Sequence, residues 1–236
     1  MNNEKKLSQL VTVARMRTDF PGKFGIPRQS GVVKSLKGKI VFEPDFRSRD
    51  MLRGLEGFSH IWVLWIFSQN MDGDGQSRWS PTVRPPRLGG NKRVGVFATR
   101  SPFRPNPVGL SAVRISRIDY EDSEGPVIYV EGADMADGTP IIDIKPYVTF
   151  TDSVTEAVSG FVDEVEYPKL KVEWQTENVS LLTCDVRQNL TAILENDPRP
   201  HYHHDSERIY RFEYSDWAVA FSVDGDVLTV TELTKY

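Results

Sequence analysis

Two carboxylates and a lysine lie close together in the sequence and are the first candidates for acid–base chemistry. Asp137 begins the turn Asp137-Gly138-Thr139-Pro140, and Asp143 and Lys145 follow it, two residues apart. Side chains two residues apart on a strand point to the same face. Asp143 and Lys145 can therefore form an ion pair, which is the simpler interpretation, or exchange protons with a substrate.

Several loops combine arginine with proline or glycine. Pro27-Arg28-Gln29 is one of them, and Arg84-Pro85-Pro86-Arg87 is another, followed by Leu88 and two glycines. A third loop contains three prolines and presents Arg100, Arg104 and Asn106. Proline fixes φ and removes a backbone donor, so these loops hold polar side chains in fixed directions. Guanidinium groups held in this way suit carboxylates and phosphates, and a purely structural turn is the alternative in each case.

Charge is distributed unevenly along the chain. The protein has 236 residues and a formal net charge of −4, from 29 basic and 33 acidic side chains. Residues 75–118 contain nine basic side chains and no Asp or Glu, so the other 192 residues carry 20 basic and 33 acidic groups. A positive region on a negative protein attracts a polyanion to one face, which points to nucleic acid or phosphate. The alternative is a solvated loop whose arginines pair with distant carboxylates.

Other classes of site and protein lack their signatures. Cys184 is the only cysteine, which excludes an intrachain disulfide and a multi-cysteine zinc site. His201, His203 and His204 lack the carboxylate or thiolate spacing of a defined site, so we predict no metal. No Gly-x-Gly-x-x-Gly motif follows a predicted strand, which argues against a Rossmann nucleotide site. Without a long apolar run or a secretory signal, we expect a cytoplasmic protein that does not bind membranes.

Short strands and long connections dominate the first 150 residues. Apolar segments predict strands at residues 39–42, 60–67, 94–98, 108–118, 127–130 and 141–144. The second of these is expected to be buried on both faces, and a brief helical turn is expected at 50–57. Many short strands favour an antiparallel sheet or barrel over a doubly wound fold.

The pattern changes after about residue 155. A strand is predicted at 170–174, then an amphipathic helix at 180–195 with Asn178 or Ser180 as its N-cap. Three further strands are predicted at 209–214, 217–223 and 227–231. The sequence thus predicts a mainly β protein with a β-barrel domain (residues 1–155) and a small C-terminal α+β domain (residues 156–236).

Together these segments resemble the TsaA-like (TrmO) family of tRNA methyltransferases. The motifs that carry the resemblance are PRQ at 27–29, RGLEGFSH at 53–60, PTVRPPRLGGN at 81–91, residues 95–109, DGTP at 137–140, DIKPY at 143–147 and DPRP at 197–200. They follow one another in the family's order across nearly the whole chain. The resemblance implies a single-sheeted β-barrel and a homodimer. It also implies S-adenosylmethionine-dependent N6-methylation of N6-threonylcarbamoyladenosine at tRNA position 37.

The resemblance further implies roles for individual residues. The implied cofactor contacts are Pro27, Arg28, Gln29, Ser68, Gln69, Arg100, Leu110, Asp137, Gly138, Thr139 and Pro140. Ser68 stands where bacterial relatives have histidine, which leaves a backbone contact there. Asp143 or Tyr147 is the candidate acceptor of the substrate proton. Residues expected to bind the substrate or the tRNA are Arg84, Arg87, Arg93, Arg104, Asn106, Lys145 and Arg199.

Two other functions are compatible with the same residues. A noncatalytic RNA-binding β-barrel would use the basic face without a cofactor. A methyltransferase acting on a small metabolite would use the cofactor without the RNA. Binding of S-adenosylmethionine would distinguish the tRNA methyltransferase from the noncatalytic RNA-binding barrel. Analysis of tRNA nucleosides would distinguish it from a methyltransferase that acts on a small metabolite.

Overall fold

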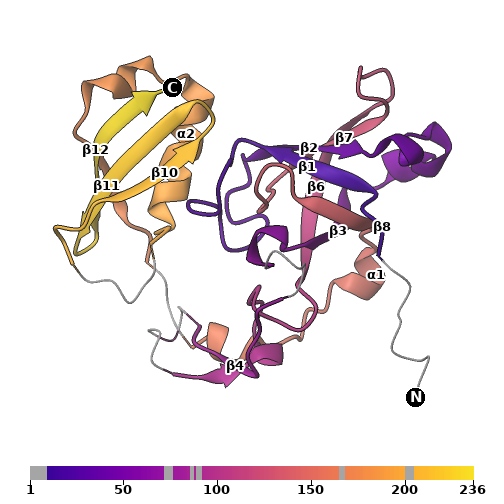
Figure 1. Ribbon diagram of the computed structural model, residues 1–236, viewed down its shortest axis with the longest axis horizontal. Coiled ribbons are helices and arrows are strands. Elements are labelled where there is room, and N and C mark those ends of the chain that lie inside the picture. The colour runs from indigo at the N-terminus through magenta and orange to yellow at the C-terminus, as the bar shows by residue number, and fades with distance from the viewer. Residues whose placement is uncertain (1–9, 72–76, 86–87, 89–91, 165–167, 200–204) are drawn as a thin grey trace.

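The N-terminal part of the chain forms a closed barrel. The computed structural model describes residues 10–71, 77–85, 88, 92–164, 168–199 and 205–236. Within them, six antiparallel strands close in the order β1-β2-β7-β6-β3-β8 (Figure 1). They are β1 (Ala14–Thr18), β2 (Lys37–Phe42), β3 (His60–Ile66), β6 (Val108–Asp119), β7 (Val127–Glu131) and β8 (Pro140–Pro146). The predicted β-barrel is confirmed.

Alternate residues of the strands fill the barrel interior. In β3, Ile61, Val63 and Trp65 are buried, whereas most of the residues between them are half-buried. Strand side chains alternate between two faces, and a closed barrel has only one interior. The expectation that residues 60–67 are buried on both faces is therefore wrong. The outward side chains Trp62, Leu64 and Ile66 are half-buried, which explains why the sequence is apolar at these positions too.

Two other parts of the barrel region differ from the sequence-based expectation. Strand β1 was not predicted, because its two arginines lie on the outer face and interrupt a short apolar pattern. Of the strand expected at 94–98, only β5 (Val94–Gly95) is extended, paired with β4 (Thr82–Val83). A 3-10 turn, η7 (Val96–Ala98), follows β5. Because β4 has only two residues, residues 96–98 have no partner strand there and do not extend β5.

Short helical turns connect these strands. Three of them, η2 (Pro44–Phe46), η3 (Arg49–Leu52) and η4 (Leu55–Gly57), lie between β2 and β3. The last two confirm the helical turn predicted at 50–57. The turn η5 (Ser68–Asn70) follows β3 directly, and α1 (Thr149–Asp152) and η8 (Gly160–Val162) follow β8.

The C-terminal part is a four-stranded sheet packed against one helix. Its strands lie in the order β10-β11-β12-β9, with β9 parallel to β12 and the other pairs antiparallel. The elements are β9 (Lys171–Trp174), η9 (Glu177–Leu181), α2 (Cys184–Glu195), β10 (Tyr210–Tyr214), β11 (Trp217–Asp224) and β12 (Val227–Lys235). The predicted α+β composition is confirmed.

The start of helix α2 lies further along the chain than expected. Its N-cap is Thr183, whose side-chain oxygen accepts a hydrogen bond from the Val186 amide at 3.4 Å. Asn178 and Ser180 were expected to cap the helix, but both lie in the preceding turn η9. Asparagine, serine and threonine are all favoured N-caps, with threonine the weakest of the three, so propensity alone did not identify Thr183 as the start.

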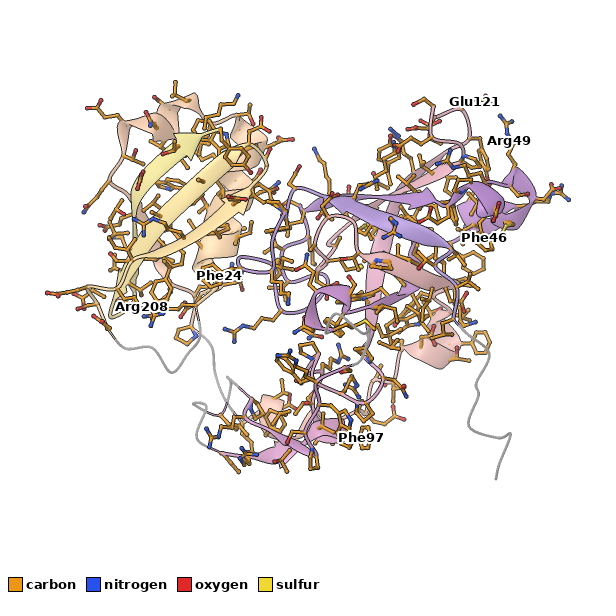
Figure 2. All side chains as sticks on the ribbon, viewed as in Figure 1. Phe24, Phe46, Arg49, Phe97, Glu121 and Arg208 are labelled. Atoms are coloured by element: carbon orange, nitrogen blue, oxygen red, sulfur yellow. The ribbon has the colours of Figure 1, made fainter. Side chains whose placement is uncertain are left out.

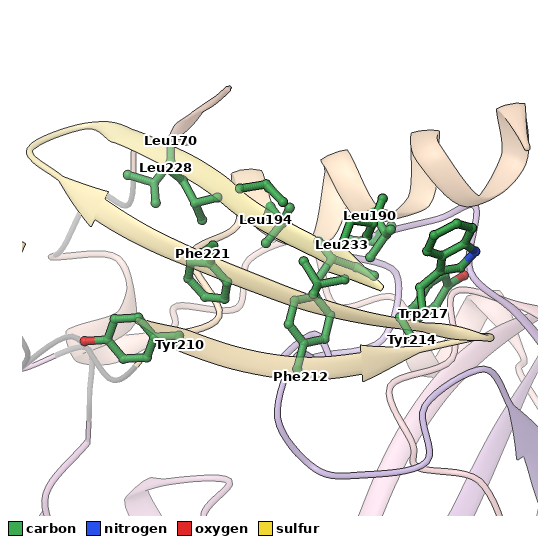
Figure 3. Close-up of a cluster of buried hydrophobic side chains, with 14 of the residues drawn as sticks. Leu170, Leu190, Leu194, Tyr210, Phe212, Tyr214, Trp217, Phe221, Leu228 and Leu233 are labelled. Carbon is green, nitrogen blue, oxygen red and sulfur yellow. The ribbon is translucent and has the colours of Figure 1, made fainter. Parts of the chain in front are cut away.

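The apolar core of the C-terminal sheet contains residues from both ends of the chain. Figure 3 shows side chains from β10, β11 and β12 packed under α2. Phe20, Val33 and Leu36, which come from the connection between β1 and β2, are buried in the same cluster. The core of the barrel, in contrast, draws all its residues from positions 13–144.

Candidate functional site

The turn formed by residues 137–140 is fixed against the end of β1. The amide of Gly138 donates to the Met16 carbonyl at 2.8 Å, and the amide of Asp137 donates to the Phe20 carbonyl at 2.8 Å. Gly138 has φ +74° and no atom within 4 Å of the position that a Cβ would take. The backbone at this glycine is therefore open to close approach by a ligand.

The carboxylate of Asp137 is accessible at this turn. It accepts the Thr18 amide at 3.2 Å and lies 3.5 Å from the Arg17 guanidinium, and both ionic side chains are more than two-fifths exposed. Such a carboxylate can accept hydrogen bonds from hydroxyl or ammonium groups of a ligand. Thr139, by contrast, is buried, and its hydroxyl donates to the Ala136 carbonyl at 2.8 Å, so its side chain stabilises the turn itself.

The loop that carries Pro27, Arg28 and Gln29 lies beside the segment that carries Arg100. The Arg100 guanidinium donates to the Gln29 side-chain oxygen, although the two residues are 71 positions apart. The amide of Gly31 donates to the Gly132 carbonyl at 2.9 Å, which anchors the loop to the end of β7. The structure therefore brings together two segments that the family resemblance implies as cofactor contacts.

Asp134 connects this loop to the barrel. Its carboxylate accepts a 2.6 Å hydrogen bond from the Ser111 hydroxyl, which itself accepts one from the Trp65 indole at 3.0 Å. The backbone of Ser30, the residue after Gln29, also hydrogen-bonds to the Asp134 carboxylate. Burial raises the pKa of Asp134 to about 6, and these hydrogen bonds and the nearby Arg100 limit the rise.

Sequence reasoning missed Asp134. The residue stands between Ala133 and Met135, which are both buried in the barrel core. A carboxylate between two apolar residues that follow a strand was the available signal, since a buried charge needs partners. Nothing in the local pattern shows that these partners come from β6 and from the loop after Gln29.

Ser68 and Gln69 lie in the turn η5 at the end of β3. The backbone carbonyl of Gln69 accepts a hydrogen bond from the Lys23 ammonium group, which belongs to the connection between β1 and β2. The amide of Phe67 donates to the Pro107 carbonyl at 2.8 Å. These contacts place η5 between the Pro27–Gln29 side of the molecule and the start of β6.

Leu110 and Asp143 lie in one row across three strands. Leu64 on β3 is opposite Leu110 on β6 and opposite Asp143 on β8. Residues directly opposite in a sheet point to the same face, here the outer one, because Val63 and Trp65 point inward. Neighbouring strands are ~4.8 Å apart, so the backbones of Leu110 and Asp143 are about 10 Å apart. Leu110 is half-exposed.

Asp143 forms the ion pair that its spacing to Lys145 suggested. The Lys145 ammonium lies 2.9 Å from the carboxylate, which also accepts the Ile144 amide at 2.9 Å. Tyr147 lies instead at the far end of β8, where its ring contacts His60 and Trp62. At ~3.3 Å per residue, Tyr147 is about 23 Å along the strand from Pro140. Of the two candidate proton acceptors, therefore, only Asp143 lies near the 137–140 turn of the same chain.

The basic segment, residues 75–118, is partly exposed: its part around β4 lies below the barrel in Figure 1, and its last residues form the barrel strand β6. Arg114 and Arg117 pair with carboxylates at 3.2 and 3.7 Å. Among the described residues, no ion pair involves Arg84 or Arg93, although Arg93 donates to the Thr82 hydroxyl at 2.7 Å. Arg84 and Arg93 are both exposed.

Other predicted substrate residues have structural partners or lie outside the described part. The Arg104 guanidinium donates to the Thr99 carbonyl at 3.0 Å, and Asn106 accepts the Val108 amide through its backbone at 2.8 Å. Arg199 is largely buried, with its guanidinium 3.0 Å from the Asp197 carboxylate. Arg87 and the cluster His201, His203 and His204 lie outside the described residues.

Comparison with known proteins identifies the family. The family model of the tRNA-methyltransferase O N-terminal domain matches residues 15–153, and that of the TrmO C-terminal domain matches residues 164–236. The chain belongs to the TrmO family. It is therefore an enzyme of a methyltransferase family, and a noncatalytic RNA-binding barrel is no longer supported.

Individual TrmO relatives and structures agree with this assignment. The tRNA (adenine(37)-N6)-methyltransferase of Escherichia coli K12 is 39% identical over 222 residues, covering 91% of both chains. A putative S-adenosylmethionine-dependent methyltransferase of Pseudomonas aeruginosa is 38% identical over 197 residues, covering 80% of this chain and 81% of the relative. The crystal structure of TrmO from P. aeruginosa superposes with a TM-score of 0.77 at 30% identity, covering 100% of both chains.

Two further findings concern metals and membranes. Among the described residues, no group of three or more His, Cys, Asp or Glu side chains is arranged to hold a metal ion. Within the same part of the chain, no helix has the length and apolar character needed to cross a bilayer.

Proposed function

We propose that this TrmO-family enzyme transfers a methyl group from S-adenosylmethionine to N6 of N6-threonylcarbamoyladenosine at position 37 of tRNA, in the cytoplasm. The observation that carries the proposal is the meeting of the Pro27–Gln29 loop with Arg100, beside a barrel whose 137–140 turn offers an open backbone and an accessible carboxylate. The named activities of the relatives support the coarser part of the proposal, S-adenosylmethionine-dependent methylation and N6 of adenine 37 in tRNA.

The residues at this site fit the chemical groups of S-adenosylmethionine. Its carboxylate suits the Arg100 guanidinium, and its ammonium and ribose hydroxyls suit the Asp137 carboxylate and the Gln29 amide. Gly138 leaves the backbone of the turn open to close approach. Ser68, Gln69 and Leu110 complete the proposed contacts, with Leu110 as an apolar surface on the outer face of β6. When bound, S-adenosylmethionine supplies an electrophilic methyl group.

Asp143 is the proposed acceptor of the proton that N6 must lose. The nitrogen belongs to a urea-like group and is a weak nucleophile, so it needs both alignment and a base. Precise alignment of two reactants can supply roughly 7–11 kcal/mol. Lys145 holds the Asp143 carboxylate at 2.9 Å on the outer face, in the row that contains Leu110. Tyr147 is the weaker candidate, because it lies at the other end of β8.

The basic segment is the proposed tRNA surface. Arg84 and Arg87 are the candidates for pairing with the threonyl carboxylate, since a planar guanidinium can donate two parallel hydrogen bonds to it. Arg93, Arg104, Asn106, Lys145 and Arg199 are the other proposed contacts to substrate or phosphate. For Arg199, such a contact requires its side chain to leave Asp197.

A homodimer is the proposed assembly. Phe97 on η7 is 80% exposed (Figure 2). Trp79 and Phe103 on the same basic segment are about half-exposed. Several exposed large apolar side chains within one stretch of chain are typical of a protein interface. The expected mass in solution is therefore twice 26.8 kDa.

Mass analysis of tRNA nucleosides tests this function. In a strain that lacks the protein, the methylated threonylcarbamoyl nucleoside should disappear and its unmethylated precursor should accumulate. Wild-type protein should restore the modification, and the Arg100→Ala variant should not. Unchanged tRNA nucleosides would contradict the proposal and favour a small-metabolite acceptor.

A further inference from the structure

The C-terminal domain packs around the segment that leads into the Pro27–Gln29 loop. The ring of Phe24 lies between 6.2 and 6.4 Å, centroid to centroid, from those of Tyr210, Phe212 and Phe221. Figure 2 shows Phe24 beside the C-terminal sheet rather than beside the barrel. The segment just before the proposed cofactor contacts is therefore held by the other domain.

The next residue shows how close this packing is. Gly25 has φ +93°, and a Cβ there would lie 2.4 Å from the ring of Phe212. Any side chain at this position would have to displace the ring, so the loop backbone passes directly over β10. Phe20, before the loop, is also buried in this core, with its ring 5.0 Å from that of Tyr214.

Polar contacts hold the loop to the same domain. The Arg28 guanidinium donates to the Arg199 carbonyl at 2.9 Å. Arg199 is fixed in turn by Asp197, whose carboxylate accepts from both the amide and the guanidinium of Arg199. At the beginning of the segment, the Ser215 amide donates to the Asp19 carbonyl at 2.8 Å. The C-terminal domain thus contacts the segment before the loop and within it.

We propose that the C-terminal domain is a positioning element of the cofactor site: by holding Phe24 and Arg28, it fixes the Pro27–Gln29 loop in the conformation that binds S-adenosylmethionine. This role is separate from any contact between the domain and tRNA, and it rests on the proposed cofactor site. A loop already ordered before binding loses less conformational entropy when the ligand arrives. Loosening the loop should therefore weaken cofactor affinity and leave the methyl-transfer chemistry largely intact.

Phe24→Leu tests the proposal in the full-length protein. It removes the three ring contacts and keeps an apolar side chain in the core. Calorimetry should show S-adenosylmethionine binding weaker by about tenfold, the effect of one or two newly mobile side chains and their backbone. At saturating cofactor, kcat and the KM for tRNA should stay within about twofold, a split that general misfolding would not give.

Val172→Ala is the matched control. Val172 packs against the same core from β9, the opposite edge of the sheet from β10. It should lower the melting temperature without changing cofactor affinity. If Phe24→Leu does not fold, Asp197→Asn serves instead, because it loosens Arg199 and so the Arg28 contact. A loss of cofactor affinity in Val172→Ala equal to that in the loop variants would overturn the proposal.

Gln29→Ala separates failure of this proposal from failure of the proposed function. If Gln29→Ala leaves cofactor binding unchanged, the proposed cofactor site is wrong and the positioning role falls with it. If Gln29→Ala weakens binding while Phe24→Leu and Asp197→Asn do not, the site stands and the positioning role is overturned. Weaker binding in the Gln29 variant and in a loop variant, with Val172→Ala unaffected, supports both.

Discussion

The two apolar cores of this protein are assembled differently. The barrel core is made only of residues between positions 13 and 144, whereas the C-terminal core combines residues from 170 onward with Phe20, Val33 and Leu36. The barrel is thus complete in itself, but the C-terminal sheet is covered in part by a segment that belongs to the N-terminal sequence. That segment carries the proposed cofactor loop, so the stability of one domain and the site of the other share the same residues.

The largest expected effect comes from a small change in the shared segment. Gly25→Ala should lower the free energy of unfolding by about 3–4 kcal/mol, because the new Cβ would lie 2.4 Å from the Phe212 ring and alanine disfavours φ +93°. Hydrogen exchange should show that the amides of β10 and β11 lose protection first. Gly22→Ala is the control, since no atom lies within 4 Å of its Cβ position. Equal effects of the two variants would contradict the shared core.

The corresponding test in the barrel is Gly109→Ala. A Cβ at Gly109 would lie 2.2 Å from the Trp65 ring, so the indole must move out of its packed position in the barrel. Overpacking of this kind should destabilise the protein by about 2–3 kcal/mol. Here the lost protection should be confined to β3 and β6, with the C-terminal sheet unchanged. Gly95→Ala, which has open space at its Cβ position, should have little effect.

Asp134 should make the barrel side of the site sensitive to pH. Because its pKa rises to about 6 in the folded protein from 3.8, the folded state binds more protons than the unfolded state between these values. The contribution of this group to the free energy of unfolding therefore falls as pH rises from 4 to 6, by up to about 2–3 kcal/mol.

The Asp134→Asn variant removes this titration. Its free energy of unfolding, measured by denaturant titration, should fall less from pH 4.5 to pH 7 than that of the wild type. Asp45→Asn, a change at an exposed carboxylate on η2, should keep the wild-type difference. An identical pH dependence in Asp134→Asn and the wild type would contradict the role of burial at Asp134.

The smallest expected effect lies outside both cores, on the basic segment. Affinity for tRNA should fall steeply with added salt, and Arg93→Ala should reduce the slope of log affinity against log salt concentration by about one. The Arg114→Ala variant should change the slope less, because Arg114 already pairs with Glu131 at 3.2 Å. A flat salt response in the wild type would exclude the basic segment as the phosphate-binding surface.

Most of the fold was predictable from sequence, and the reason is periodicity. Strands β3, β6, β7 and β8 are rich in apolar residues, so each is recognisable in the sequence between its polar loops. Strand β1, in contrast, is short, and its two outward arginines hide the pattern. The segments of the site were recognisable from their prolines, arginines and family motifs. Their contacts were not, because the pairing of Gln29 with Arg100 and the partners of Asp134 depend on how distant strands close the barrel.

Long-range packing explains the remaining differences. Asp143 and Tyr147 are four residues apart, yet only the direction of β8 determines which of them lies near the 137–140 turn. No local pattern shows that Phe24 enters the C-terminal core, since one aromatic residue between glycines and prolines is typical of a surface loop. The contacts of the C-terminal domain with Phe24 and with the Pro27–Gln29 loop are therefore visible only in three dimensions.

A crystal structure of the protein with bound S-adenosylmethionine would test the proposed cofactor site without any variant. The cofactor is expected to lie between the Gln29–Arg100 pair and the 137–140 turn, with its methyl group facing the outer row that contains Leu110 and Asp143. Density for the cofactor at any other place on the molecule, with this position empty at saturating concentration, would contradict it.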